Sequence, residues 1–464
     1  MSQFSEESKR KLEDHIVKSM AENHVPGLSI ALVADGKTIY ARGFGARNLQ
    51  DNTPATPDTV YGIGSCTKSF TALAIMQLVD KGLLDVQDPV SEYLPFKLGK
   101  EENPIRIHHL LSHSSGVPAL GMAEILIRKL TGPDDHWVPM TSLEDFMHHV
   151  NNATAEVAAE PEKRYFYFNC GFTLLGEIIE KVAKTKYDLY VKENILKPLG
   201  MNRSTFLKTQ FNKDPDTMTA HRKNKDGSVT ATTHPFSKLI YAPGGLLSPV
   251  TELVRYLTMN MNGGTYEDKT IVEASLLEQM YKIYIETGSG FFGKQGYGYG
   301  WSIAEDFLGH RIVQHGGSTG VSSAHVAFIP DARVGVALAA NTSPFGSPSI
   351  PLEALAILLG KDPEKELPSL GIERKLAILQ GTYESYRGAR RLSVVRKGPM
   401  LYLEEKTRFI ESSIPLIPDS EKIENNRFYI YSGLGAKTPV EFELSSEGNV
   451  DMYMERWRMH KTGT

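Results

Sequence analysis

An apolar helix that opens on a serine and carries a lysine one turn later constrains this chain more than any other feature. Apolar side chains recur on successive helical turns between about Cys66 and Lys81, and Gly82 provides a natural end. A helix with so much apolar surface belongs inside a domain. Ser65 and Lys68 stand three positions apart at its start and share one face. We therefore expect a buried helix that presents a serine hydroxyl beside a lysine amine.

This pairing suits nucleophilic catalysis. A serine hydroxyl is a weak nucleophile that needs a base, and a lysine amine can be that base only in its neutral form. Burial and nearby cations lower the pKa of a lysine, because they disfavour its charge. The backbone N–H groups at a helix start can also bind an oxyanion. The simpler alternative is a serine that caps the helix while the lysine lies in solvent.

The surroundings of this motif distinguish it from a second copy in the same chain. The second S-x-x-K, Ser8 to Lys11, lies on a polar helix that we expect over residues 5–22. The Ser65 copy instead follows a glycine-containing turn at residues 61–64 and opens the apolar helix. We expect Ser65, and not Ser8, to be functional.

Two further clusters could complete a site. Tyr167 and Asn169 precede a helix expected near residues 171–185. The tyrosine hydroxyl could relay the proton of Ser65, and the asparagine could bind a substrate carbonyl or steady Lys68. A core tyrosine and a capping asparagine are the alternative interpretation.

The other cluster is His315-Gly316-Gly317-Ser318, at the end of an expected strand. Its glycines would let a substrate backbone lie against the strand edge. The N–H groups of Ser318 and Ser65 could form an oxyanion hole. Taken alone, a histidine before two glycines at a strand end is also typical of an ordinary turn with no catalytic role.

The order and wide spacing of the three clusters match the motifs S-x-x-K, Y-x-N and K-T-G. The chain resembles the class C serine β-lactamases, the D-alanyl-D-alanine carboxypeptidases, and their esterase and D-aminopeptidase relatives. The resemblance covers roughly residues 10–360. Further stretches that carry it are HLLSHSSGVP (109–118), FNCGFTLLGEIIEKV (168–182), ILKPLGM (195–201) and APGGLLSPVTEL (242–253).

The resemblance implies acyl transfer to Ser65 followed by hydrolysis of the acyl-enzyme. Lys68 would be the base, Tyr167 would assist proton transfer, and His315 would orient one of these two or assist deacylation. The residues that the resemblance assigns to catalysis are Ser65, Lys68, Tyr167 and His315, and those assigned to substrate binding are Asn169, Gly317 and Ser318. No metal and no organic cofactor is implied.

One departure from the family pattern concerns the third motif, where His315 stands in place of the lysine of K-T-G. A histidine is mostly neutral at pH 7, whereas that lysine helps to hold the carboxylate of a β-lactam or of a peptide C-terminus. The H-x-G form resembles D-aminopeptidases and carboxylesterases, so amides and esters are favoured as substrates. A literal Lys461-Thr462-Gly463 near the chain end follows the second domain, and we expect it to play no part.

The fold class expected from these patterns is α+β, with an antiparallel sheet of five or more strands flanked by helices. We place the catalytic domain at residues 1–360, a charged, proline-containing linker at 361–373, and a C-terminal domain at 374–464. Short strands separated by turn residues make the last a small antiparallel barrel, which resembles the lipocalin-like domain of some D-aminopeptidase-type peptidases. Residues 117–160 are rich in glycine and proline and predict an irregular surface excursion that could act as a lid.

Composition excludes several classes of partner. The net charge is −4 and hydrophobic residues make up 41% of the chain, which favours neither nucleic acid nor an anionic membrane. The first twenty residues are polar, so we expect a cytoplasmic location. Two cysteines, Cys66 and Cys170, are too few for a disulfide framework. Each directly follows a candidate site residue, Ser65 and Asn169 respectively.

We therefore predict a peptidase or amidase of the D-aminopeptidase type that acts on a small-molecule or peptide substrate and could form a homo-oligomer. The alternatives left open are a carboxylesterase of the same fold, a β-lactamase or acyltransferase, and a catalytically silent binding protein. The intact set of a serine, lysine, tyrosine and histidine argues against the silent protein.

Overall fold

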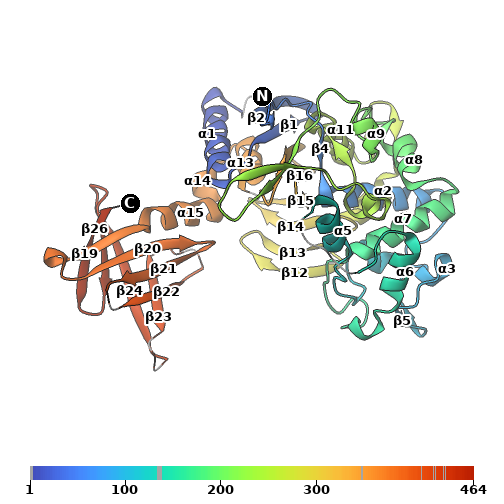
Figure 1. The fold of residues 1–464 in the computed structure, drawn as a ribbon. Helices are drawn as coiled ribbons and strands as arrows, with labels where there is room; N and C mark the ends of the chain where they lie inside the picture. Colours follow the sequence, from blue (N-terminus) through green and yellow to red (C-terminus); the bar gives the residue numbers. More distant parts are fainter. Residues whose placement is uncertain are drawn as a thin grey trace. The chain divides into compact units, whose positions relative to one another are not determined.

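The computed structural model describes residues 4–132, 138–345 and 349–463, apart from 409, 422, 424, 432 and 434. The chain divides into two compact units, Met1–Lys361 (unit 1) and Asp362–Thr464 (unit 2). Unit 1 contains a large sheet with helices, and unit 2 contains a barrel (Figure 1).

The nine-stranded sheet of unit 1 is antiparallel between every pair of neighbours, which confirms the expected architecture. From edge to edge its strands are β12 (Ile285–Gly290), β13 (Gly293–Tyr297), β14 (Ser302–Phe307), β15 (His310–Ser318), β16 (Ser323–Ile329), β17 (Val334–Ala340), β1 (Gly27–Ala34), β2 (Lys37–Asn48) and β3 (Thr53–Pro54). Strands β1 and β17 are buried along almost their whole length, so side chains on both faces of the sheet are covered there. Helix α11 (Val250–Met261) packs on both of these strands, and α13 (Ser349–Leu358) packs on β17 and β16.

Helix α2 (Thr67–Asp80) is the apolar helix identified in the sequence, and all its residues from Thr67 to Leu78 are buried. It packs against α7 (Asn169–Ala183), α10 (Tyr241–Gly244) and α12 (Ala274–Met280). The amphipathic helix expected near the N-terminus is α1 (Glu6–Asn23), capped by the Ser5 side chain, and it packs on α13. The helices thus fix the start of α2 among segments that are distant in sequence.

The shorter helices and strands of unit 1 connect these elements. They are α3 (Val90–Tyr93), α4 (Ile107–Leu111), α8 (Tyr187–Val191), α9 (Lys208–Phe211), β4 (Tyr61–Gly62), β5 (Gly99–Lys100), β6 (Asn103–Pro104), β7 (Ala220–Lys223), β8 (Val229–Thr232), β9 (Leu247–Ser248), β10 (Thr265–Tyr266), β11 (Lys269–Thr270) and β18 (Thr342–Ser343).

The excursion at residues 117–160 is more regular than expected. Its residues 133–137 lie outside the described part, but it contains α5 (Met122–Thr131) and α6 (Leu143–Asn151). The prediction of an irregular segment is wrong for these stretches, because the glycines and prolines flank the helices and do not interrupt them. In α5, Met122, Ile125 and Leu126 follow helical spacing and are buried.

Unit 2 is a closed barrel of eight antiparallel strands, which confirms the expected β-domain. Its strands are β19 (Gly381–Ser385), β20 (Arg391–Lys397), β21 (Met400–Lys406), β22 (Glu411–Pro418), β23 (Arg427–Tyr431), β24 (Lys437–Leu444), β25 (Val450–Met454) and β26 (Trp457–Gly463). Closure pairs β19 with β26, so that each of the eight strands has a neighbour on both sides. The sequence Lys461-Thr462-Gly463 lies in β26, within this barrel.

The segment expected to be a linker, residues 361–373, forms α14 (Pro363–Glu366) and the start of α15 (Pro368–Leu379). The Asp362 side chain caps α14, and each helix has a proline in its first turn, where a missing N–H costs nothing. Leu376 and Leu379 of α15 are buried in the core of the barrel. Residues 362–373 therefore belong to unit 2, and only Lys361 belongs to unit 1.

Candidate active site

Ser65 lies in a short 3-10 helix, η1 (Gly64–Cys66), directly before α2. Two glycines let strand β15 approach it. Gly64 has a φ of +53°, and a Cβ on it would lie 2.4 Å from the backbone N of Ser318. A Cβ on Gly317 would lie 1.9 Å from the carbonyl O of Ile63 and 3.0 Å from the backbone N of Ser65. Only glycine fits at either position, and the backbones of Ser65 and Ser318 are neighbours as a result.

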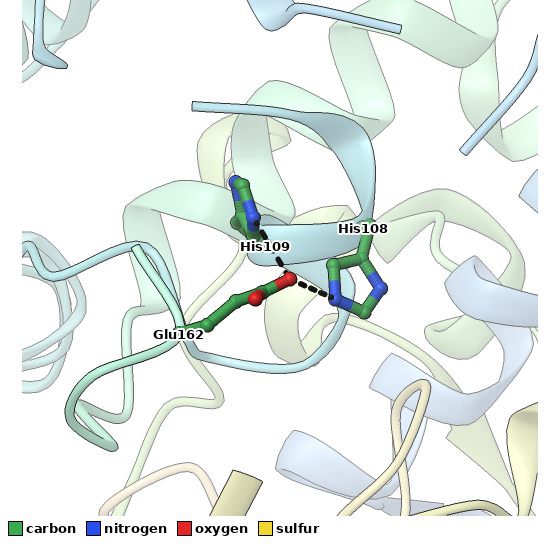
Figure 2. Close-up of side chains that lie close together, drawn as sticks. All are labelled: His108, His109 and Glu162. Atoms are coloured by element: carbon green, nitrogen blue, oxygen red, sulfur yellow. Dashed lines mark ion pairs between the residues drawn. The ribbon is translucent and has the colours of Figure 1, made fainter. Parts of the chain in front are cut away.

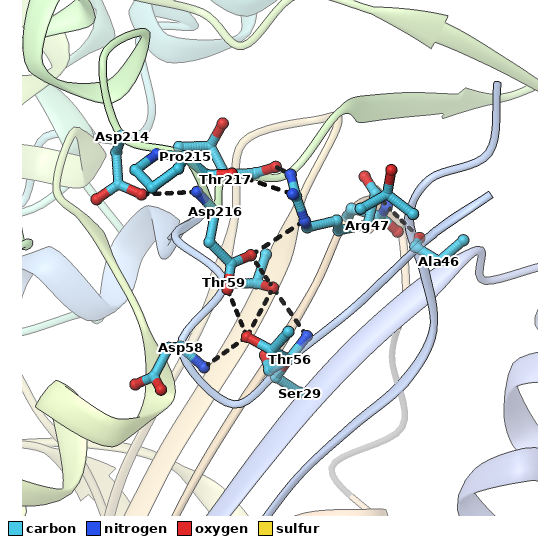
Figure 3. A network of polar contacts seen from close by, with 12 residues as sticks. Ser29, Ala46, Arg47, Thr56, Asp58, Thr59, Asp214, Pro215, Asp216 and Thr217 are labelled. Atoms are coloured by element: carbon cyan, nitrogen blue, oxygen red, sulfur yellow. Dashed lines mark hydrogen bonds and ion pairs between the residues drawn. The ribbon is translucent and has the colours of Figure 1, made fainter. Parts of the chain in front are cut away.

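A polar network fixes the chain just before this turn (Figure 3). The carboxylate of Asp216 accepts hydrogen bonds from the hydroxyls of Thr56 and Thr59 and pairs with the Arg47 guanidinium at 3.1 Å. The Asp216 carbonyl also accepts the N–H of Val60 at 2.9 Å. These bonds hold residues 56–60 against a distant loop, so that β4 and the turn leading to Ser65 start from a fixed position.

Lys68 is fully buried, and its amine has three polar neighbours. Nζ lies 3.2 Å from Ser65 Oγ, 2.7 Å from Asn169 Oδ1 and 2.7 Å from the carbonyl O of Pro243. Burial lowers the pKa of Lys68 well below the usual value for a lysine. Loss of a proton would leave two N–H groups for the two carbonyl-type oxygens and one lone pair for the Ser65 hydroxyl.

Tyr167 lies beside both Ser65 and Lys68. The Ser65 side chain is close enough to the Tyr167 hydroxyl to act on its pKa, and the Tyr167 ring centroid lies 4.7 Å from Lys68 Nζ. Burial raises the pKa of Tyr167 above that of a free tyrosine, so its hydroxyl keeps its proton at neutral pH. Asn169 begins helix α7, and its side-chain oxygen is directed to Lys68. The structure thus brings Ser65, Lys68, Tyr167 and Asn169 together.

His315 is buried, and both of its ring nitrogens have partners. Nδ1 lies 2.6 Å from the carbonyl O of Gly316, which can only accept, so Nδ1 carries the proton. Nε2 therefore accepts the hydroxyl proton of Tyr297 at 2.8 Å. Burial, with Lys68 nearby, lowers the pKa of His315 to about 3. His315 is a neutral imidazole bound to Tyr297, and its ring centroid lies 6.3 Å from that of Tyr167.

The backbone N–H of Ser318 is directed towards Ser65. The N–H of Thr319 donates to Ser322 across the hairpin between β15 and β16. Because successive N–H groups of a strand point to opposite sides, the N–H of Ser318 points away from β16. On that side β14 pairs only as far as Gln314, so Ser318 faces η1. The N–H groups of Ser65 and Ser318 can thus both reach one oxyanion.

These residues open onto a pocket of about 510 Å³. Its walls come from η1, α5, α10 and the end of β15, and the charged groups among its lining residues are Glu124, Arg128 and Arg222. The Arg222 guanidinium donates to the carbonyls of Thr131 and Gly132. Glu124 is exposed, yet its negative charge acts on the pKa of both Lys68 and Tyr167. Helix α5, which the sequence did not reveal, therefore contributes the pocket's carboxylate.

One cluster in the described part of the chain has the spacing of a metal site, namely His108, His109 and Glu162 (Figure 2). The two Nε2 atoms lie 3.3 Å and 3.5 Å from the Glu162 carboxylate. However, His109 Nδ1 accepts the backbone N–H of Arg106 at 2.9 Å, so its proton is on Nε2. A metal would need the Nε2 lone pair. The arrangement is therefore better explained by histidine N–H groups directed at the Glu162 carboxylate than by a metal ion.

Several site residues were not predicted from the sequence. Tyr297 and the carbonyl of Pro243 touch His315 and Lys68, respectively, although neither stands in one of the three motifs. The stretch APGG at 242–245 was a signal for Pro243, since it already carried the resemblance.

Cys66 and Cys170 are both free and buried, and burial raises the pKa of each thiol to about 12. Neither is a thiolate at neutral pH.

Comparison with known proteins matches both units to families. The family model described as Beta-lactamase matches residues 12–360, and that of the Pab87 octamerisation domain matches residues 363–460. The structure of an octameric penicillin-binding protein homologue from Pyrococcus abyssi is similar, with a TM-score of 0.90 and 42% identity over 97% of this chain and 99% of that one.

Two curated relatives are more distant. Protein flp of Staphylococcus aureus (strain NCTC 8325 / PS 47) is 29% identical over 343 residues, which cover 73% of this chain but only 64% of flp. A penicillin-binding protein of Bacillus subtilis (strain 168) is 24% identical over 460 residues, 95% of each chain. Within the described residues, no helix is both long enough and apolar enough to cross a bilayer.

Proposed function

Because the chain belongs to the beta-lactamase family of serine hydrolases, we propose that it cleaves its substrate through an acyl-enzyme on Ser65. The observation that carries this proposal is the arrangement around Lys68. Asn169 Oδ1 and the carbonyl of Pro243 take up two N–H groups, so a neutral amine would direct its lone pair at the Ser65 hydroxyl. Burial maintains that neutral form by lowering the pKa of Lys68.

In the proposed reaction, Ser65 Oγ attacks the substrate carbonyl while its proton passes to Lys68. The N–H groups of Ser65 and Ser318 stabilise the resulting oxyanion. Tyr167, which keeps its proton and touches Ser65, relays a proton to the leaving group as the carbonyl re-forms. Water then attacks the acyl-enzyme, and Lys68, having returned its proton, again serves as base. Asn169, Gly317 and Ser318 hold the substrate against the edge of β15.

For the substrate, we propose an amide or peptide with a free amino group, as for a D-aminopeptidase. His315, at the position of the family's carboxylate-binding lysine, is buried and neutral and so offers no positive charge. Glu124 places a carboxylate in the pocket, which suits an ammonium group.

A panel of matched substrates tests this choice. D- and L-amino-acid amides would be compared with their N-acetylated forms, with p-nitrophenyl esters and with a chromogenic cephalosporin. We expect the free amine to improve kcat/KM by about tenfold or more, as a charge-assisted hydrogen bond of about 1.5–3 kcal/mol predicts, and Glu124→Gln to abolish the difference. Better hydrolysis of acetylated amides or esters would favour the carboxylesterase. A cephalosporin as the best substrate would instead assign the pocket to carboxylate binding by Arg128 and Arg222.

We also propose that unit 2 mediates self-association. Its sequence matches the Pab87 octamerisation domain, and the similar protein from Pyrococcus abyssi is octameric. Light scattering on the full chain and on residues 1–361 tests this. A large assembly for the full chain and a smaller species for the truncated chain are expected, whereas the same size for both would contradict the proposal.

A further inference from the structure

The segment that carries Tyr167 has no regular secondary structure of its own, yet both neighbours of Tyr167 are bound to one residue. The N–H of Phe166 donates to the carbonyl O of His113 at 3.0 Å. The N–H of Phe168 donates to His113 Nδ1, also at 3.0 Å. His113, which lies just after α4, therefore holds the backbone on each side of Tyr167 with its own backbone and its own side chain.

The ring of His113 also occupies the centre of the aromatic group behind the site. Its centroid lies 4.3 Å from that of Tyr167 and 4.6 Å from that of Tyr297. His113 is fully buried, and Tyr297 is the residue that donates its hydroxyl proton to His315. One histidine thus connects the tyrosine beside Ser65 to the tyrosine that binds the third motif.

This placement of His113 costs free energy in two ways. Its φ is +58°, in the left-handed region that a histidine rarely adopts. Because Nδ1 accepts a hydrogen bond, the ring proton is on Nε2, and that N–H has no hydrogen-bond partner among the described residues. Such features persist where the surrounding structure needs them, and they are found mostly at functional sites.

We propose that His113 is a positioning residue that sets the Tyr167 hydroxyl against Ser65 by binding the backbone on both sides of Tyr167. The inference rests on the proposed role of Tyr167. It predicts that His113 acts on the rate through Tyr167 alone and makes no contact with substrate.

A matched pair of variants separates this role from simple packing. His113→Asn places Oδ1 where Nδ1 was and tolerates the left-handed conformation. His113→Gln has the same amide, but one bond farther out, and loses the acceptor for Phe168. With an amino-acid p-nitroanilide as probe, whose leaving nitrogen needs a proton, we expect His113→Gln to lower kcat by about tenfold or more with little change in KM, and His113→Asn to retain most of the activity.

The same two substitutions are then made in a Tyr167→Phe background, and melting temperatures confirm that each variant folds. If His113 acts through the Tyr167 hydroxyl, His113→Gln should change kcat by less than about twofold in that background. An equal loss in both backgrounds, or equal activity of the Asn and Gln variants, would overturn the inference. Wild-type activity of Tyr167→Phe alone would remove the proposed role of Tyr167 itself. If His113→Gln does not fold, His113→Gly replaces it in both backgrounds with the same expected losses, because glycine adopts the left-handed conformation without strain and lacks the acceptor for Phe168.

Discussion

Replacement of Lys68 by arginine is the substitution that tests the proposed chemistry most directly. An arginine can still donate to Asn169 Oδ1 and to the carbonyl of Pro243, the two acceptors that lie 2.7 Å from Nζ. It stays charged and has no lone pair for the Ser65 hydroxyl. Lys68→Arg therefore removes the base while it preserves the polar contacts that a truncation would lose.

The size of the effect follows from the role of a general base. Loss of such a group lowers the rate by about 10²–10⁴-fold, which corresponds to roughly 2.7–5.4 kcal/mol in the activation free energy. Lys68→Ala should show a similar loss of rate and, in addition, lower stability by about 1–3 kcal/mol for each unsatisfied acceptor. The two variants should thus differ in melting temperature more than in reactivity.

Labelling of Ser65 by a serine-directed phosphonate, followed by intact mass, measures reactivity without knowledge of the substrate. In the wild type the labelling rate should rise with pH and level off well below the usual pKa of a lysine, because the base is active only after it loses its proton. Lys11→Arg in the second S-x-x-K motif is the matched control, since Lys11 is exposed on α1 and pairs with Glu7.

Two results would refute the reasoning. One is a folded Lys68→Arg variant that is labelled within about threefold of the wild-type rate, which a base-dependent mechanism does not allow. The other is a wild-type labelling rate that continues to climb into the pH range where an ordinary lysine titrates.

Three further predictions concern the surroundings of the site and the stability of the chain. Tyr297→Phe should leave His315 Nε2 a buried acceptor without its donor and lower the free energy of unfolding by about 1–3 kcal/mol, whereas the exposed Tyr386→Phe should have no effect in the same denaturant titration. Acidification from pH 6.5 to pH 5 should destabilise the fold, because His234 and His315, with pKa values of about 3, stay neutral when folded but gain protons when unfolded. Each histidine should lower the free energy of unfolding by about 2 kcal/mol over that interval. Glu177, whose pKa is raised to about 7, acts in the opposite direction because it takes up a proton in the folded protein. Thermal melts that show no loss of stability would contradict the assignment of the two histidines as neutral. A chain that ends at residue 361 should stay folded by circular dichroism, since unit 1 has its own core, and insolubility of that chain would show that the division into units is wrong.

The sequence alone determined the features that depend on residues close together in the chain. Helical spacing placed Ser65 and Lys68 on one face, and the apolar turns that follow them predicted that α2 is buried. Alternating and apolar runs predicted the strands of both units, because the backbone geometry of a single element sets their period. The glycines of the first motif indicated a tight turn and those of the third motif indicated room for a substrate backbone, whereas in the structure Gly64 and Gly317 make room for the chain's own backbone.

Which distant groups complete the site depends on how the chain folds. Asn169 and Pro243 reach Lys68 from 101 and 175 positions away, and no local period encodes such a contact. The same holds for Tyr297, which binds His315, and for His113, which holds the segment of Tyr167. The sequence did not predict α5, because the glycines and prolines on either side of it are typical of a loop. Local pattern fixes the elements and the pairing of Ser65 with Lys68, whereas the pKa of Lys68 depends on burial by segments that meet only when the chain folds.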